Sequence, residues 1–473
     1  MTSRRPILVT HSYYLRFDAK QWRRQEPYPP LGTLLAAAVL REDGHDVRVF
    51  DSMLADGVGD FAKTLDDLRP RIVVMVEDNF NYLTKMCTTR MREAAFEMIR
   101  AARHAGCRVV VNGSDASDHA AYYLEVGANA VALGEPEATI VDVVSAWSRE
   151  VSPDLSTIPG LALRAPSDAQ VPDVVRTPAR PVLQQLDSLP LPAWDLIDVE
   201  PYRDVWNAAH NRFSWNLVAS RGCPYKCNWC AKPIFGTRYA QRSPASLASE
   251  VAYVSARYQP DHIWYADDIF GLTGDWIESF SREVTKQNAR VPFKMQSRAN
   301  LMKARVVQAL RDAGAEEVWL GAESGSQQVL DSMDKGTTVQ QVRDATRRLQ
   351  DVGIKVGWFI QLGYPGEQWA DILETRDLIR EERPDEIGVS VSYPLPGTTF
   401  FENVKRQLGS KTNWRDSAEL AMMFRGTYST SLYRRVRNIL HEEVSGDEKT
   451  LDGKWYDLEV FCRESGQRVA EVR

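Results

Sequence analysis

The sequence lacks any apolar run long enough to cross a membrane. Longer apolar stretches, such as residues 34–40, stop well short of the roughly 20 residues that a transmembrane helix needs. The first residues, Met-Thr-Ser-Arg-Arg-Pro, also lack the apolar core and the small-residue cleavage site of a secretion signal. We therefore expect a cytoplasmic protein with no membrane partner.

An excess of positive charge is missing as well. The 58 Lys and Arg residues are outnumbered by 64 Asp and Glu residues, for a net charge of −6. Such a chain has no general attraction to phosphate backbones, so we expect no nucleic-acid partner. Low-complexity tracts and solenoid repeats are also absent, while 44% of the residues are hydrophobic. A chain of 473 residues with this composition is expected to fold into two main domains and a smaller terminal piece.

Cysteine is scarce, with six residues in the whole chain, which excludes a disulfide framework. Three of them crowd into one loop at the spacing C-x3-C-x2-C: Cys223, Cys227 and Cys230. A structural zinc site would need a fourth ligand, and no histidine or further cysteine lies nearby. Three thiolates suit an iron–sulfur cubane with one iron left open. We discard a chance meeting of buried thiols and treat Cys87, Cys107 and Cys462 as ordinary thiols.

The first 150 residues predict an α/β domain. Short β-branched runs begin near residues 7, 47, 72, 109 and 130, and helical patterns lie between them, over 31–41 and 90–104 for example. This alternation is typical of a doubly wound, Rossmann-like parallel sheet. Ligands of such sheets bind beyond the carboxyl ends of the strands.

A second series of six strands begins after a proline-rich connector. The strands are expected near residues 216, 262, 293, 317, 355 and 386, with helical stretches between them. Six β/α units are too few for a complete eight-fold barrel and predict a partial (β/α)6 barrel. The predicted organisation is a Rossmann-like domain at 1–150, a linker at 151–205, the partial barrel at 206–401 and a small C-terminal domain at 402–473, which either covers the site or forms a small aromatic core.

The cysteine loop and its surroundings resemble the radical S-adenosylmethionine (SAM) superfamily. Trp229 before the third cysteine, Gly222 before the first and Lys232-Pro after the third match the family's form. The resemblance covers roughly residues 206–400. It implies a 4Fe-4S cluster whose open iron binds SAM and cleaves it to a 5′-deoxyadenosyl radical. It also implies an external electron donor, such as flavodoxin or ferredoxin, and a small-molecule substrate.

Polar residues follow the predicted barrel strands and are candidates for contacts with SAM. They are Asp267, Arg298, Glu323, Ser324 and Gln361. In similar enzymes the glutamate after the fourth strand contacts the ribose of SAM, so the resemblance gives this role to Glu323 and gives carboxylate binding to Arg298. The alternative for each residue is helix capping at a β-to-α turn, where Asp, Ser and Gly are favoured.

The N-terminal domain resembles the cobalamin-binding domains that are fused to radical SAM barrels in class B methyltransferases. The resemblance begins at Tyr28-Pro-Pro-Leu-Gly and extends through the linker over about residues 1–400. It places candidate cobalamin contacts at Asp78, Asn79, Asn112, Gly113, Gly134 and Glu135, although the segment of Asp78 and Asn79 could equally be the start of a helix. Small residues in these loops would let the backbone approach a flat corrin ring.

One departure concerns the lower cobalt ligand. The D-x-H-x-x-G loop that supplies a histidine in many cobalamin proteins is missing, and His11 stands after the first strand without it. Either cobalamin binds with no protein histidine below the cobalt, or the domain has lost cobalamin and kept its shape. We expect His11, His45 and His119 to be surface or turn residues rather than ligands.

The resemblance favours a cobalamin-dependent radical SAM methyltransferase that methylates an unactivated carbon of a small molecule in specialised metabolism. One SAM would supply the methyl group through cobalamin, and another would supply the radical. The alternative is a radical rearrangement, a cyclisation or the transfer of another SAM fragment, such as 3-amino-3-carboxypropyl, with a degenerate cobalamin domain. A third, non-enzymatic reading makes the cluster a structural or electron-carrying element, against which the barrel loops argue.

Overall fold

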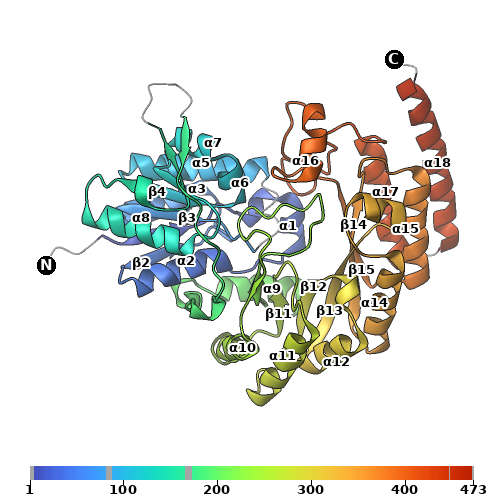
Figure 1. The fold of residues 1–473 in the computed structure, drawn as a ribbon, viewed down its shortest axis with the longest axis horizontal. Coiled ribbons are helices and arrows are strands. Elements are labelled where there is room, and N and C mark those ends of the chain that lie inside the picture. Colours follow the sequence, from blue (N-terminus) through green and yellow to red (C-terminus); the bar gives the residue numbers. More distant parts are fainter. Residues whose placement is uncertain (1–4, 81–87, 166–172, 447, 471–473) are drawn as a thin grey trace.

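The computed structural model describes residues 5–80, 88–165, 173–446 and 448–470. Two α/β domains lie side by side, the N-terminal one on the left of Figure 1 and the barrel with the C-terminal helices on the right. Within the described ranges no helix is both long and apolar enough to cross a membrane.

The N-terminal domain is doubly wound, as predicted. Its sheet has the order β2-β1-β3-β4-β5-β6-β7, and the first five strands run parallel. They are β1 (Ile7–Thr10), β2 (Val47–Phe50), β3 (Ile72–Val76), β4 (Arg108–Asn112) and β5 (Ala130–Ala132). The central strands are apolar on both faces because helices cover both sides of the sheet.

Two helix layers enclose this sheet. One layer contains α2 (Leu31–Glu42) and α8 (Glu137–Arg149), which contact each other. The other contains α3 (Val58–Leu68), α5 (Thr89–His104) and α7 (Ala120–Val126). Two separate apolar clusters fill the two sides of the sheet.

The sheet continues into the segment that we expected to be linker. β6 (Leu161–Arg164) and β7 (Val174–Arg176) add two antiparallel strands at its edge. The first domain therefore extends beyond residue 150 to at least residue 176. These strands are short and β7 is largely exposed, so they carry no apolar alternation that the sequence could reveal. The true connector follows, and α9 (Glu200–His210) ends it.

The six predicted barrel strands are all present. They lie parallel in the order β15-β14-β13-β12-β11-β8 and form an open sheet. Their bounds are β8 (Ser214–Leu217), β11 (His262–Tyr265), β12 (Phe293–Ser297), β13 (Ala315–Glu323), β14 (Lys355–Leu362) and β15 (Glu386–Val391). The helices of the β/α units are α10 (Pro244–Tyr258), α11 (Gly274–Lys286), α12 (Ala304–Ala313), α13 (Gln327–Ser332), α14 (Val339–Asp351) and α15 (Trp369–Glu382).

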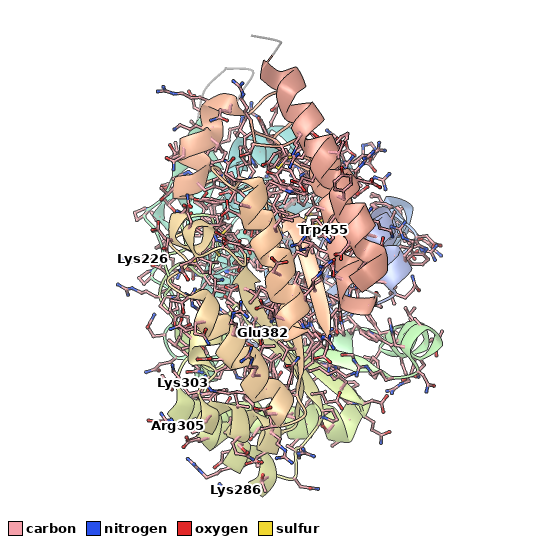
Figure 2. All side chains as sticks on the ribbon, turned by 90° about the vertical axis from the view of Figure 1, so that its right-hand side faces the viewer. Lys226, Lys286, Lys303, Arg305, Glu382 and Trp455 are labelled. Atoms are coloured by element: carbon pink, nitrogen blue, oxygen red, sulfur yellow. The ribbon has the colours of Figure 1, made fainter. Side chains whose placement is uncertain are left out.

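The C-terminal segment shares the core of the barrel. After α16 (Thr399–Val404), helix α17 (Thr430–Ser445) packs against β15 and α15, and α18 (Glu448–Ala470) packs against α17. Tyr433 and Trp455 are buried in the same apolar cluster as the barrel strands. Figure 2 views this side of the molecule, with Trp455 of α18 and Glu382 of α15 labelled. The segment thus extends the barrel instead of forming a core of its own.

Candidate functional site

The three cysteines lie on a loop between two short strands, β9 (Ser220–Arg221) and β10 (Ala240–Gln241). Cys223 is buried, and Cys227 and Cys230 are partly exposed. The loop begins at Gly222, whose φ is +76° and whose missing side chain would clash with the carbonyl of Arg238. A residue with a side chain could not open the loop in this way.

The donor set fits an iron–sulfur cluster. In such a cluster each cysteine binds a different iron, so the thiolates need not converge on one point. Consistent with this, no three His, Cys, Asp or Glu side chains within the described ranges are grouped to hold a single metal ion. The thiolates of Cys223, Cys227 and Cys230 are the groups that would hold the cluster.

Arg298, at the carboxyl end of β12, contacts the cysteine loop directly. Its Nη1 donates to Sγ of Cys227 at 3.4 Å, and its guanidinium carbon lies 3.8 Å from the ring centre of Tyr225. Its Nη2 donates to Oγ1 of Thr337 at 2.9 Å and to the carbonyl oxygen of Lys335. Arg298 therefore joins the cysteine loop to the loop that follows α13.

Glu323 forms a buried ion pair that the sequence did not predict. Oε1 of Glu323 accepts from Nζ of Lys335 at 2.6 Å, and both side chains are less than a tenth exposed. The pair stands over Gly321, where an added Cβ would lie 2.5 Å from Nζ of Lys335. Glu323 has a φ of +62°, in the left-handed region. Lys335 lies in a loop 12 residues downstream, and no motif marked it.

Asp267 lies at the end of β11, as predicted, and is held by the neighbouring strand. Its carboxylate accepts from the backbone N–H of Ala219 at 3.1 Å and from Oγ of Ser220. Burial raises the pKa of Asp267 to about 7. These contacts fix the chain just before the cysteine loop, and a direct contact of Asp267 with SAM stays a prediction.

Ser324 and Gln361 also lie at the carboxyl edge of the barrel. Oγ of Ser324 accepts from the backbone N–H of Ser326 at 3.1 Å, which is the turn-stabilising role that competes with ligand binding. Nε2 of Gln361 donates to Oγ of Ser392 at 3.0 Å. Both side chains are buried, and their contacts with SAM remain predictions.

Asn228, between the second and third cysteines, is a further residue that the sequence did not single out. Its Nδ2 donates to the carbonyl oxygen of Ser332 at 2.8 Å and to Oδ2 of Asp334 at 3.0 Å. Its Oδ1 accepts from the hydroxyl of Tyr364 at 2.7 Å. Asn228 thereby ties the cysteine loop to the ends of α13 and β14.

The candidate cobalamin residues lie at the carboxyl edge of the N-terminal sheet. Oδ1 of Asp78 accepts from the backbone N–H of Gly32 at 3.1 Å. Nδ2 of Asn79 donates to Oδ1 of Asn112 at 2.9 Å. An added Cβ on Gly113 would lie 2.8 Å from Cγ of Glu77. These residues hold the strand ends close together, so four of the six predicted contacts form one edge.

Two buried polar atoms on this edge have no partner among the described residues. They are Oδ1 of Asn79 and Oγ of Ser114. Buried polar atoms are nearly always hydrogen-bonded, so such atoms mark a site where a ligand or water completes them. The edge therefore fits a polar cofactor with many hydrogen-bonding groups, as cobalamin is.

The other two predicted contacts, Gly134 and Glu135, lie where the two domains meet. The backbone at Gly134 passes close to the cysteine loop, since an added Cβ would lie 3.7 Å from the carbonyl oxygen of Ile234. Glu135 lies 3.5 Å from the guanidinium of Arg221, which also binds Glu137 at 2.6 Å. Arg221 immediately precedes the cysteine loop, so this pairing fixes the loop to the N-terminal domain.

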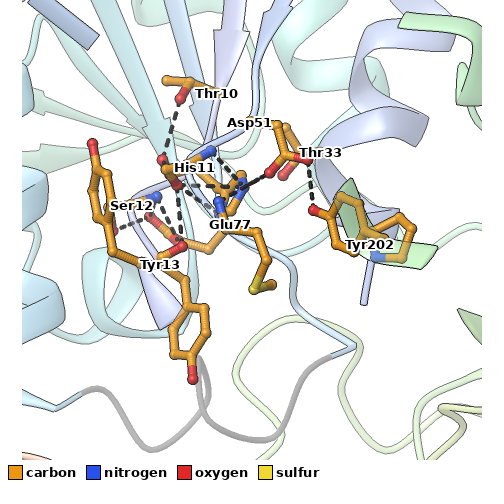
Figure 3. A network of polar contacts seen from close by, with 12 residues as sticks. Thr10, His11, Ser12, Tyr13, Thr33, Asp51, Glu77 and Tyr202 are labelled. Atoms are coloured by element: carbon orange, nitrogen blue, oxygen red, sulfur yellow. Dashed lines mark hydrogen bonds and ion pairs between the residues drawn. The ribbon is translucent and has the colours of Figure 1, made fainter. Parts of the chain in front are cut away.

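His11 follows β1 and is fully buried, so of the surface or turn positions that we expected for it, a place at the surface is wrong. Its Nε2 lies 2.9 Å from Oδ1 of Asp51, and its Nδ1 lies 3.1 Å from Oγ of Ser52. Asp51 in turn accepts from the hydroxyl of Tyr202 in α9 at 2.6 Å. Figure 3 shows this network between β1, β2 and α9. Both ring nitrogens of His11 are thus engaged by protein groups.

Comparison with known proteins agrees with this geometry. Residues 217–379 match the Radical SAM superfamily. The chain is 27% identical to an uncharacterised methyltransferase of Pyrococcus horikoshii over 82% of the chain and 81% of that protein. It is also 27% identical to the anaerobic magnesium-protoporphyrin IX monomethyl ester cyclase of Rubrivivax gelatinosus, over 60% of the chain and 49% of the cyclase.

A solved structure shares the two-domain fold. TsrM from Kitasatospora setae is a radical S-adenosylmethionine methyltransferase whose structure contains cobalamin and a 4Fe-4S cluster. It superposes with a TM-score of 0.69 at 19% identity, over 86% of this chain and 79% of TsrM. Together with the cysteine loop, the match of residues 217–379 shows that the chain is an enzyme that contains a radical SAM domain.

Proposed function

We propose that the chain is a cobalamin-dependent radical SAM methyltransferase that methylates an unactivated carbon of a small molecule. The observation that carries the proposal is the junction at Arg221. This residue joins the cysteine loop to Glu135 and Glu137 at the edge of the N-terminal sheet. The edge suited to cobalamin and the loop suited to the cluster are therefore parts of one buried interface.

Residues of the barrel position the cysteine loop and offer polar groups to SAM on one side of this interface. When bound, the cluster and SAM supply a 5′-deoxyadenosyl radical. Arg298 holds the Cys227 loop at a fixed position against the loop of Lys335 and Thr337. Glu323 is a buried carboxylate that can accept from ribose hydroxyls, and Lys335 lies 2.6 Å from it as its buried ion-pair partner.

Residues at the carboxyl edge of the N-terminal sheet offer polar groups and open backbone to cobalamin on the other side of the interface. When bound, cobalamin supplies a carrier for the methyl group. Gly134, where an added Cβ would meet only the carbonyl oxygen of Ile234 at 3.7 Å, leaves its backbone open to a flat ring, whereas Gly113 is packed against Glu77. Asn79 and Ser114 offer polar atoms that have no partner among the described residues to the amides of cobalamin. His11 contributes no ligand in this proposal, because Asp51 and Ser52 engage its ring.

A radical cyclisation, rearrangement or transfer of another SAM fragment is the second candidate. It is favoured by the similarity to the Rubrivivax gelatinosus cyclase, although the chain spans about half the length of that relative. In this case the N-terminal domain would keep its sheet without binding cobalamin. An external electron donor such as flavodoxin or ferredoxin, and a small-molecule substrate, belong to both proposals.

Anaerobic reconstitution with iron, sulfide and hydroxocobalamin tests the proposal. We expect the purified protein to retain one cluster and one corrinoid per chain, measured by iron and cobalt analysis and by mass spectrometry. With SAM carrying an isotopic label in its methyl group, the label should leave SAM and appear on the corrinoid or in the product. A protein that loads the cluster and cleaves SAM but retains no corrinoid would support the second candidate instead.

A further inference from the structure

The inner face of the barrel carries two aromatic side chains outside the apolar cores. Residues of β13 alternate, so that Val318 and Leu320 are buried beneath the outer helices while Trp319 points to the inner face. Phe359 of β14 occupies the same face and is 38% exposed, although its neighbours in the strand, Trp358 and Ile360, are buried. Neither ring belongs to any of the apolar clusters.

Trp319 lies flat on the sheet because two neighbouring strands carry glycine beneath it. An added Cβ on Gly357 would lie 2.5 Å from the indole ring, and one on Gly388 would lie 3.3 Å from it. The indole N–H donates to Oε1 of Glu317 at 2.6 Å, which fixes the ring in its plane. The ring of Phe359 lies 4.8 Å from that of Trp319 at 33°. We call the surface formed by Trp319 and Phe359 the aromatic shelf.

The aromatic shelf is continuous with the SAM site. Gly321, the next inward position after Trp319, lies about 6.6 Å further along the strand and carries the Glu323–Lys335 pair. Gln361 is likewise the next inward position after Phe359. Towards the opposite end of the strands, Nζ of Lys294 lies 5.8 Å from the ring centre of Tyr28. The shelf therefore lies between the residues expected to bind SAM and the amino ends of the barrel strands.

We propose that the aromatic shelf binds a planar aromatic or conjugated ring of the substrate. The proposal rests on the proposed function and adds the substrate class. Two rigid rings, one seated on glycines and held by its own N–H, lie 4.8 Å apart at 33° and leave Phe359 38% exposed, so the shelf presents a partly exposed π-face. A planar ring gains offset stacking there in addition to apolar burial, whereas a puckered saturated ring gains only the burial.

A matched pair of probes tests this inference. 2-Naphthol is planar, and decahydro-2-naphthol has the same skeleton and hydroxyl group but puckered rings. Their affinities are measured by ligand-observed NMR on the cluster-loaded protein with SAM present. The variants are Phe359→Ala, which removes half of the shelf, and Gly357→Ala, which must displace the indole. Tyr456→Ala, which removes an exposed aromatic ring on α18, is the control.

We expect wild-type protein to bind 2-naphthol more tightly than the saturated probe. Phe359→Ala and Gly357→Ala should each weaken 2-naphthol roughly three- to tenfold, with Tyr456→Ala unchanged. Equal affinity for the two probes, or unchanged 2-naphthol binding in Phe359→Ala, would overturn the inference. Both results are read by binding alone. A failure of corrinoid loading or of methyl transfer would contradict the proposed function and still leave probe binding to the cluster-loaded protein measurable.

Discussion

At the residue scale, Sγ of Cys227 accepts from the guanidinium of Arg298, and the same thiolate is expected to bind the cluster. Replacing it with alanine removes one of three thiolates and leaves an iron unsupported. We expect Cys227→Ala to lose the visible absorbance of the cluster and all cleavage of SAM after reconstitution. Cys107→Ser, in a buried thiol of the N-terminal domain, should retain both. Full iron content and cleavage in Cys227→Ala would refute the cluster assignment.

The Glu323–Lys335 pair changes how the ribose contact must be tested. Glu323→Gln alone leaves the buried Lys335 without its counter-charge, so a loss of stability could be mistaken for a loss of binding. The informative comparison is Lys335→Met against the double variant Glu323→Gln/Lys335→Met. Removing the carboxylate should then weaken SAM roughly tenfold or more, since hydrogen bonds to charged groups contribute about 1.5–3 kcal/mol.

The readout is SAM affinity by isothermal titration, with iron content measured in parallel. Iron content should stay near normal in both variants because neither side chain is expected to touch the metal. Equal SAM affinity in the single Lys335 variant and the double variant would leave Glu323 with a purely structural role.

The contacts of both ring nitrogens of His11 lead to a prediction that can be tested by spectroscopy. With Asp51 and Ser52 at its two nitrogens, His11 should not coordinate cobalt. In the cob(II)alamin state of the reconstituted protein, we expect no nitrogen superhyperfine splitting, and a spectrum that His11→Asn leaves unchanged. Splitting that disappears in His11→Asn would contradict the prediction.

The site residues that could be predicted from the sequence differ from those that could not in how their contacts form. Cys223, Cys227 and Cys230 are recognisable because one short loop brings them together. Lys335 and Asn228 act through contacts made when separate loops close on each other, and neither has a characteristic spacing from its partners. Local sequence patterns predict the residues that bind a metal cluster. The residues that position them through hydrogen bonds and ion pairs depend on tertiary packing, which these patterns do not show.

Whole strands and helices of both sheets were predictable because their apolar periodicity is strong. The exceptions are elements that are largely exposed or whose apolar face is buried against another part of the chain. β6 and β7 are short edge strands, and the C-terminal helices looked like a separate domain because their apolar faces are completed by β15 and α15. In both cases the missing information is the identity of the surface that the element packs against.

The connection from β14 to α15 contains a buried carboxyl group that should make stability depend on pH. Oε2 of Glu367 accepts from the backbone N–H of Gly363 at 2.6 Å, and Oε1 is buried without a partner among the described residues. Burial raises the pKa of Glu367 from 4.5 to about 8. The folded protein therefore keeps this proton up to about pH 8, whereas the unfolded chain releases it near pH 4.5.

The contribution of Glu367 to stability should thus be present at low pH and be lost as the pH rises towards 8. Glu367→Gln mimics the protonated group and should lack this loss. Thermal unfolding of both proteins from pH 5 to pH 8.5 is the measurement. The Tm difference between variant and wild type should be smallest at pH 5 and should grow steadily in favour of the variant as the pH rises towards 8. A constant difference in Tm across this range would contradict the prediction.

At the scale of the whole molecule, the ion pairs of Arg221 with Glu135 and Glu137 join the two domains. Arg221 and Glu137 are both buried. Arg221→Met would leave buried carboxylates unpaired, and breaking such a pair typically costs about 3–5 kcal/mol. We expect the variant to unfold in urea in two separated transitions and to lose affinity for both cofactors.

The matched control is Arg305→Gln, which breaks an ion pair with Asp275 that is exposed on the barrel surface. Exposed pairs of this kind contribute little, so this variant should keep a single transition like wild type. If Arg221→Met also unfolds in one transition with unchanged midpoint, the junction does not hold the domains together.

The hydrogen bonds between Asp18 and Ser417 can form only after almost the whole chain has been translated. Asp18 caps α1 (Ala19–Arg24) and accepts from the backbone N–H of Ser417 at 3.0 Å, across a separation of 399 residues. At about 5–20 residues per second, a ribosome makes Ser417 roughly 20–80 s after Asp18. The N-terminal domain thus emerges long before its last partner, and its surface around Asp18 must wait for the end of translation to be covered.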